Sequence, residues 1–186
     1  LCDDGHNVTV LDNLSLGFKE NVDKRAELVV GDILNKDDLD KAFSKNIDVV
    51  FHFAAWKAAC ESMIEPLKLS VNNITGTITL IDAIVRHEVN NIVLSSSCAI
   101  YGVPHYLPLD EKHSKHPENY YGYTKLAIEE NLEWYSKLKG LRYAALRYFN
   151  ATGYDVKGQI SGREHSPTNL CPIIMEVAAG ERDKLD

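Results

Sequence analysis

Three tyrosines precede one lysine in the segment YYGYTK, residues 120–125, at the start of a stretch predicted to be helical. Side chains four residues apart are neighbours on a helix, so Lys125 can reach the ring of Tyr121, whereas Tyr120 and Tyr123 point elsewhere. A phenol has a pKa of about 10, and a nearby cation lowers it by stabilising the phenolate. Tyr121 is therefore a candidate general base supported by Lys125, although the same spacing occurs in ordinary helices with a solvated lysine.

A hydroxyl lies at a strand end before this helix. Ser97 closes the apolar run NIVLSSS, and the carboxyl ends of strands are where open α/β sheets bind ligands. A serine there can hydrogen-bond the substrate oxygen that Tyr121 deprotonates. The combination of Ser97, Tyr121 and Lys125 in this order is more specific than the tyrosine and lysine alone.

An acidic residue follows the first strand-like run. Asp12 in VLDNLSLG stands where a dinucleotide-binding fold places the carboxylate that binds the adenosine ribose, which favours NAD over NADP. A turn-forming Asp–Asn pair explains the same residues equally well. The glycine-rich turn that comes about twenty residues before such a carboxylate does not fit into the 11 residues before Asp12, so we expect the sequence to begin inside its domain.

Apolar runs of strand length alternate with helical patterns. Such runs indicate strands buried on both faces, and they cover residues 7–11, 27–33, 48–55, 91–97 and 142–150. Helical patterns cover 35–45, about 62–87 and 121–140, the last ending at Gly140. We expect α/β architecture with a doubly wound parallel sheet.

The pattern from 62 to 87 also predicts which helix face packs on the sheet. Apolar residues recur there every three or four positions, at Val71, Ile74, Ile78, Ile81 and Val85. The irregular segment 102–119, which joins the strand of Ser97 to the helix of Tyr121, is long enough to suggest a functional loop.

Composition and charge exclude several classes of protein. The 186 residues are 45% hydrophobic and 25% charged, with a net charge of -7, which argues against nucleic acid or an anionic membrane as partner. The sequence has no CxxC pair, signal peptide or membrane-length apolar run, so we expect reduced cysteines and a cytoplasmic location. His113 and His116 are interpreted as solvated loop residues, His52 as a core histidine, and no metal site is expected.

Taken together, the motifs resemble the extended short-chain dehydrogenase/reductase family. LDNLS, GDI, HFAAWKAACES, NNITGT, SSSCAIYG, YYGYTK, LRYFNATG and NLCPI occur in the family's order with nearly its spacing. The resemblance implies a Rossmann domain that binds NAD, here residues 1–150, followed by the beginning of a sugar-nucleotide region, here 151–186. It also implies that the family's first strand with its glycine-rich turn, and its C-terminal part, lie outside this sequence.

The resemblance assigns roles residue by residue. It implies that Tyr121 is the base, Lys125 its support and Ser97 a hydroxyl partner that also contacts the substrate. It implies NAD contacts from Asp12, Asn13, Asp32, Ile33, Phe53, Ala54, Ala55, Lys57, Asn72 and Phe149. It implies UDP-sugar contacts from Asn150, Asn169 and Leu170.

The implied activity is NAD-dependent, reversible epimerisation at C4 of UDP-glucose and UDP-galactose through a 4-keto sugar. The field of Lys125, together with the positive nicotinamide ring, would lower the Tyr121 pKa. Alternatives are an epimerase of UDP-N-acetylhexosamines or UDP-pentoses, or a non-catalytic NAD sensor. Cys98 and Ala99 stand where 4,6-dehydratases carry Asp and Glu, which argues against that activity. A homodimer is expected, with activity assigned to the full-length protein.

Overall fold

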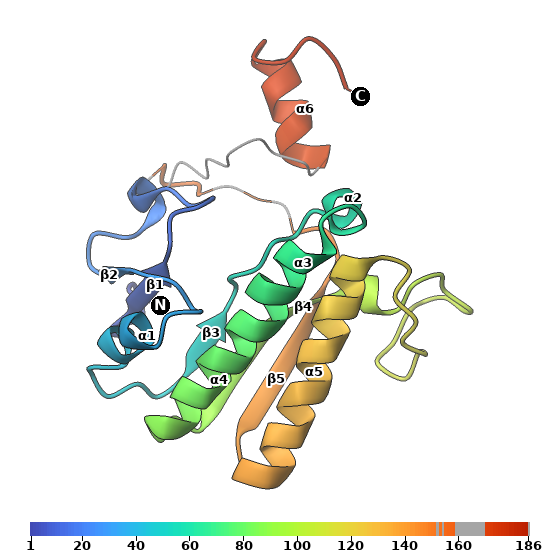
Figure 1. Cartoon of the computed structure of the whole chain (residues 1–186). Helices are drawn as coiled ribbons and strands as arrows, with labels where there is room; N and C mark the ends of the chain where they lie inside the picture. Colours follow the sequence, from blue (N-terminus) through green and yellow to red (C-terminus); the bar gives the residue numbers. More distant parts are fainter. Residues whose placement is uncertain (152, 154, 159–169, 186) are drawn as a thin grey trace. The chain divides into compact units, whose positions relative to one another are not determined.

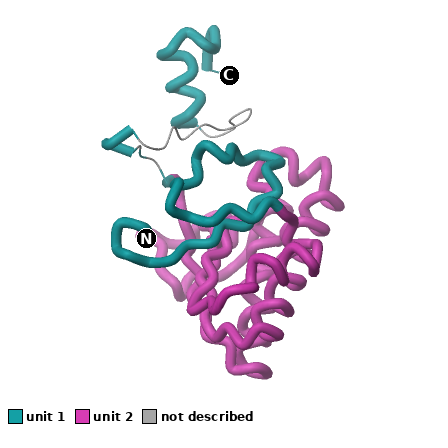
Figure 2. Tube along the Cα trace, turned by 90° about the vertical axis from the view of Figure 1, so that its left-hand side faces the viewer, with its two compact units in different colours: residues 1–30, 151–186 teal, residues 31–150 magenta. Residues whose placement is uncertain are grey.

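Strands and helices alternate along the chain in the computed structural model, which describes residues 1–151, 153, 155–158 and 170–185. These residues fall into two compact units, one of residues 1–30 with 151–186 and one of residues 31–150 (Figure 2). All strand pairs are parallel, and the fold is α/β as predicted.

The first unit contains a two-stranded parallel sheet. Strand β1 (Thr9–Asp12) pairs with β2 (Glu27–Val30), with Asp12 opposite Val30 at the carboxyl ends. A short 3-10 helix, η1 (Lys19–Asn21), lies between the two strands in sequence, and α6 (Leu170–Ala178) is the unit's α-helix. Both strands occur where the sequence predicts them.

The second unit contains a three-stranded parallel sheet of order β3-β4-β5. Its strands are β3 (Val50–His52), β4 (Asn91–Ser97) and β5 (Arg142–Tyr148). Its helices are α1 (Lys36–Ala42), α2 (Ala59–Ser62), α3 (Pro66–Leu69), α4 (Gly76–Arg86) and α5 (Tyr120–Lys139), with a π-helical turn η2 (Ser70–Thr75) and a 3-10 turn η3 (Cys98–Ile100). In Figure 1, α3 and α4 run continuously beside α5.

Local signals fix both ends of α5. The Asn119 side chain accepts a hydrogen bond from the Gly122 amide, which satisfies one of the unpaired amides at the helix start. Gly140 ends the helix with a φ of 71°, a left-handed conformation that glycine adopts without strain. The predicted stop at Gly140 is confirmed.

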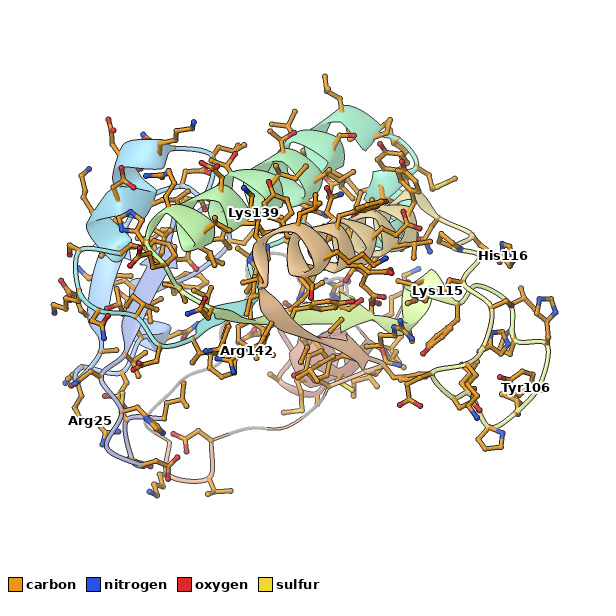
Figure 3. The ribbon with its side chains drawn as sticks, turned by 90° about the horizontal axis from the view of Figure 1, so that it is seen from below. Arg25, Tyr106, Lys115, His116, Lys139 and Arg142 are labelled. Carbon is orange, nitrogen blue, oxygen red and sulfur yellow. The ribbon has the colours of Figure 1, made fainter. Side chains whose placement is uncertain are left out.

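The core of the second unit lies between its sheet and helices α4 and α5, which lie on the same side of the sheet in Figure 3. The fully buried side chains there include Ile81, Ile84, Ile92, Leu94, Ile128 and Leu132. Strands β3 and β5 differ from the predicted burial on both faces, because Phe51 is 43% exposed and Tyr148 is 41% exposed. Both residues belong to the sheet face that α4 and α5 do not cover.

The packed face of the long helical segment differs from the predicted stripe. Ile81 is buried as expected, but Val71 is 42% exposed, and Asn73 and Thr77 are buried instead. The π-helical turn η2 explains the shift, because it uses more residues per turn than an α-helix and rotates the preceding residues around the axis. None of the helices in the described ranges is both long and apolar enough to cross a membrane.

Candidate active site

Ser97 and Tyr121 meet where β4 ends and α5 begins. The Ser97 hydroxyl accepts a hydrogen bond from the Ala99 amide at 3.2 Å and so caps the turn η3. It also hydrogen-bonds the Tyr121 phenol, which lies in the first turn of α5. The strand end therefore brings together two of the three predicted catalytic residues.

Gly122 permits this close approach. A Cβ atom at this position would lie only 2.5 Å from the Ala99 carbonyl oxygen and 3.0 Å from Pro117 Cβ. A larger residue would push the start of α5 away from η3 and hence Tyr121 away from Ser97. This role was not predicted from the sequence, although a glycine in the first turn of a helix can indicate such close packing.

Lys125, the third predicted catalytic residue, lies one turn after Tyr121 on the same face of α5. Its side chain is 3% exposed, and its ammonium donates a hydrogen bond of 2.8 Å to the Ser95 carbonyl oxygen. The ammonium nitrogen is 5.9 Å from the centre of the Tyr121 ring. Because burial disfavours the charged form, the pKa of Lys125 falls to about 8.

The protein residues alone do not lower the Tyr121 pKa. Burial of the phenol raises it, and the hydrogen bond from Ser97 only partly opposes this effect. Lys125 is therefore not sufficient to activate Tyr121, and the expected activation depends on the positive nicotinamide ring that we predicted to act with it.

The other two tyrosines of the segment have different surroundings. The Tyr120 hydroxyl hydrogen-bonds the Ser70 hydroxyl at 2.6 Å. Tyr123 is 48% exposed, and its ring lies 5.4 Å from that of Tyr120. The helix geometry thus singles out Tyr121, as the four-residue spacing predicts.

In the first unit, the Asp12 carboxylate ends β1 and stabilises a turn. One of its oxygens accepts a hydrogen bond of 2.7 Å from the Leu14 amide, whose φ is 56°. A Cβ atom on Gly17 would lie 3.0 Å from both carboxylate oxygens, so the carboxylate rests against this glycine. Asn13 accepts a similar bond from the Ser15 amide. The structure thus contains the Asp–Asn turn that the sequence offers as an alternative. Contact of the Asp12 carboxylate with a ribose stays a prediction.

In the second unit, the predicted cofactor residues occupy different environments. The Asp32 carboxylate accepts a hydrogen bond from the Leu34 amide, whereas Ile33 is 7% exposed and packs against Gly76. Phe53 and Phe149 expose their rings beyond the ends of β3 and β5. Ala54, Ala55 and Lys57 follow in the loop after β3, and Asn72 lies in η2.

Asn73 fixes the loop after β3, a role that the sequence analysis missed. Its side chain accepts a hydrogen bond from the Trp56 amide at 2.9 Å and donates one to the Trp56 carbonyl at 3.0 Å. It also donates to the Thr124 hydroxyl at 3.2 Å. This fully buried amide ties the loop that contains Lys57 to the helix that contains Lys125.

The predicted substrate residues are only partly described. Asn150 is exposed just after β5, and Leu170, the first residue of α6, is 67% exposed. Asn169 lies outside the described residues. The structure therefore gives no geometry for the substrate set as a whole.

The histidines divide between loop and core. His52 is 4% exposed and hydrogen-bonds Thr77 at 2.7 Å, as a core histidine should. The prediction that His113 is solvated is wrong, because it is 2% exposed and its Nε2 accepts a hydrogen bond from the His105 amide. His113 packs against Tyr101 and Tyr106 and so organises the 102–119 loop. Within the described ranges, no group of three His, Cys, Asp or Glu residues could hold a metal ion.

Comparison with known proteins gives the same family throughout. The model of the NAD dependent epimerase/dehydratase family matches residues 1–185. A UDP-glucose 4-epimerase from Lacticaseibacillus casei is 43% identical over 97% of this chain and 55% of its own length. The chain spans about half the length of the curated relatives it matches.

Solved structures show the same likeness in three dimensions. The UDP-glucose 4-epimerase from Brucella ovis in complex with NAD has a TM-score of 0.95 at 42% identity, covering 99% of this chain and 57% of that one. The Bifidobacterium longum enzyme in complex with NAD+ and UDP has a TM-score of 0.95 at 30% identity, covering 99% and 58%. The α/β fold described above is Rossmann-like.

Proposed function

Because this chain belongs to the NAD-dependent epimerase/dehydratase family, we propose that it acts within an enzyme that interconverts UDP-glucose and UDP-galactose at C4. The observation that carries the proposal is the meeting of Ser97, Tyr121 and Lys125 at the end of β4. Relatives named UDP-glucose 4-epimerase, at about 40% identity over nearly the whole chain, support the choice of sugar nucleotide.

The residues present fit NAD as the cofactor. Carboxylates at Asp12 and Asp32 are the acceptors that ribose hydroxyls and an adenine amino group require. Asp12 is the last residue of β1, and Asp32 follows β2. The remaining contacts come from Asn13, Ile33, Phe53, Ala54, Ala55, Lys57, Asn72 and Phe149. When bound, NAD+ would take up the hydride from C4 of the sugar and return it.

The protein's own groups handle the proton. The Tyr121 phenolate takes the proton of the sugar 4-hydroxyl, and the Ser97 hydroxyl binds the same oxygen as it becomes the ketone of the 4-keto sugar. Lys125 keeps a positive charge beside the phenol. When the turned sugar regains its hydride on the other face, Tyr121 gives the proton back.

The two parts of the chain divide the binding work. Residues 1–150 hold NAD, and residues 151–186 begin the region that binds the UDP-sugar, together with Asn150, Asn169 and Leu170. The protein works in galactose metabolism in the cytoplasm, which the four free cysteines support. Cell fractionation tests the location.

The full-length protein forms a homodimer. Large apolar side chains are exposed on the connection from α2 through α3 and on the outer face of α5, including Met63, Ile64, Leu67, Trp134 and Leu138. Exposed apolar surface of this kind is typical of protein interfaces. Light scattering tests the dimer, and Leu138→Glu should shift the mass towards that of a monomer.

The activity test uses full-length protein and UDP-galactose with no added cofactor. Chromatography should show conversion to UDP-glucose, because NAD stays with the enzyme through each turnover. Conversion of UDP-N-acetylgalactosamine or UDP-xylose but not UDP-galactose would identify another UDP-sugar. Bound NAD with no conversion of any of them would overturn the epimerase in favour of an NAD sensor.

A further inference from the structure

A buried ion pair joins α5 to β5 one helical turn beyond Lys125. Glu129 stands four residues after Lys125 and eight after Tyr121, so all three share one face of α5. The Glu129 side chain is 6% exposed, and Arg147 on β5 binds it through Nε at 3.0 Å and through Nη2 at 2.8 Å. This forked contact fixes direction as well as distance.

The same carboxylate also binds β4 and the loop. The Ser96 hydroxyl, beside Ser97, donates a hydrogen bond of 2.6 Å to Glu129 Oε1. The Lys115 ammonium, from the 102–119 loop, lies 3.5 Å from Oε2, and Figure 3 shows Lys115 on the part of that loop that returns to the helix. Glu129 therefore connects α5, β4, β5 and the loop.

Arg147 extends the network to the start of the loop. Its Nη1 donates a hydrogen bond of 2.8 Å to the Tyr101 hydroxyl, and its guanidinium lies 5.2 Å from the centre of that ring. Tyr101 in turn packs edge-on against the buried His113. Every element that bears a proposed catalytic residue is thus bound, directly or through one residue, to the Glu129–Arg147 pair.

Both partners are held in their charged forms. Burial raises the pKa of Glu129, but the hydrogen bonds from Arg147 and Ser96 outweigh it and leave the pKa below its ordinary value. The hydrogen bonds to Glu129 raise the pKa of Arg147. A buried ion pair is weak evidence for stability, because apolar residues of similar volume often serve a core as well or better. Its geometry therefore calls for another role.

We propose that Glu129 and Arg147 are positioning residues. They fix where α5 lies along β4 and so keep Tyr121 and Lys125 aligned with Ser97. This inference rests on the proposed epimerase activity. Neither side chain touches the phenol or its supporting ammonium, and they act through the backbone of α5 and through Ser96. A displacement of about 1 Å in such a set can reduce turnover about 100-fold.

The test measures activity and stability separately in the full-length protein. Glu129→Gln keeps the shape but loses the charge, and it should lower kcat about 10-fold to 100-fold while KM for UDP-galactose changes less than about twofold. Its kcat should also recover partly at higher pH, because a displaced Lys125 supports the phenolate less. The matched control is Glu133→Gln, one turn further along α5, where the side chain is 55% exposed. This variant should match wild type in kcat, in KM and in the pH dependence of kcat.

A double variant separates positioning from stability. Glu129→Leu with Arg147→Met removes both charges, so its urea midpoint should lie near or above that of wild type, while kcat stays at least about 10-fold low with NAD still bound. A double variant with a wild-type midpoint and a kcat within about twofold of wild type would overturn the proposal. If the double variant does not fold, Arg147→Lys takes its place. This variant keeps the positive charge but cannot bind both carboxylate oxygens of Glu129, and a wild-type urea midpoint with a kcat within about twofold of wild type would again overturn the proposal.

Failure of the epimerase proposal looks different. In that case wild-type protein itself gives no conversion, whereas failure of the positioning proposal leaves wild type active and the variants equally active.

Discussion

Replacing Lys125 by methionine removes a buried charge and leaves a side chain of similar length. Burial lowers the Lys125 pKa from 10.5 to about 8, so between these pH values the unfolded chain binds a proton that the folded chain has released. Stability due to this group therefore rises with pH across that window. The cost of burying the ammonium is complete below pH 8 and absent above pH 10.5.

The size of the effect follows from the two pKa values. Their separation corresponds to about 3 kcal/mol in favour of the neutral form. Between about pH 7 and 9.5, linkage predicts that the wild-type chain recovers about 2 kcal/mol of this cost. The methionine variant has no such group and recovers none.

The assay is urea unfolding of the 186-residue chain and of its Lys125→Met variant across this pH range. Other titrating groups are common to both proteins and cancel in the difference. We expect wild type to gain about 2 kcal/mol relative to the variant as pH rises. A difference that stays constant to within about 0.5 kcal/mol would show that Lys125 is not desolvated, and the reasoning about its charge would fail.

Three other perturbations test the packing around the site. Burial lowers the His52 pKa from 6.5 to about 3, so the stability that this group provides above pH 6.5 should be lost on acidification. Between about pH 7 and 5 the loss should be about 2 kcal/mol. Urea unfolding of the His52→Gln variant should not show this loss. Gly122→Ala should lower stability by about 1–3 kcal/mol despite the better helix propensity of alanine, because of the clash with the Ala99 carbonyl, and an unchanged urea midpoint would contradict this. Asn73→Ala removes the hydrogen bonds to Trp56 and should lower the free energy of unfolding, measured by thermal unfolding, by about 2–4 kcal/mol. It should also speed hydrogen exchange at the Trp56 amide, and unchanged exchange would refute the role of Asn73.

Much of the fold follows from local patterns in the sequence. The parallel strands were predictable because their apolar runs are short, nearly continuous and separated by helical patterns. The end of α5 was predictable because Gly140 adopts a left-handed conformation that ends a helix. The pairing of Tyr121 with Lys125 was predictable because it depends only on helical spacing.

Features that depend on contacts distant in sequence were not predictable. The packed face of the segment before α4 was misassigned because a π-helical turn leaves no mark on apolar spacing. His113 was assigned to solvent because its charged neighbours conceal the packing with Tyr101 and Tyr106. The Asn73 and Glu129 networks join residues at least 14 positions apart, so spacing along one element could not reveal them.

The central claim is that Tyr121 is the group that moves the proton. The most direct test compares kcat of the full-length wild type, Tyr121→Phe and Tyr123→Phe with UDP-galactose, with bound NAD measured in each. We expect Tyr121→Phe to keep its fold and NAD but to lose at least about 100-fold in kcat, while Tyr123→Phe, which removes an exposed hydroxyl from the same turn, stays near wild type. Near-normal turnover in Tyr121→Phe would contradict the claim.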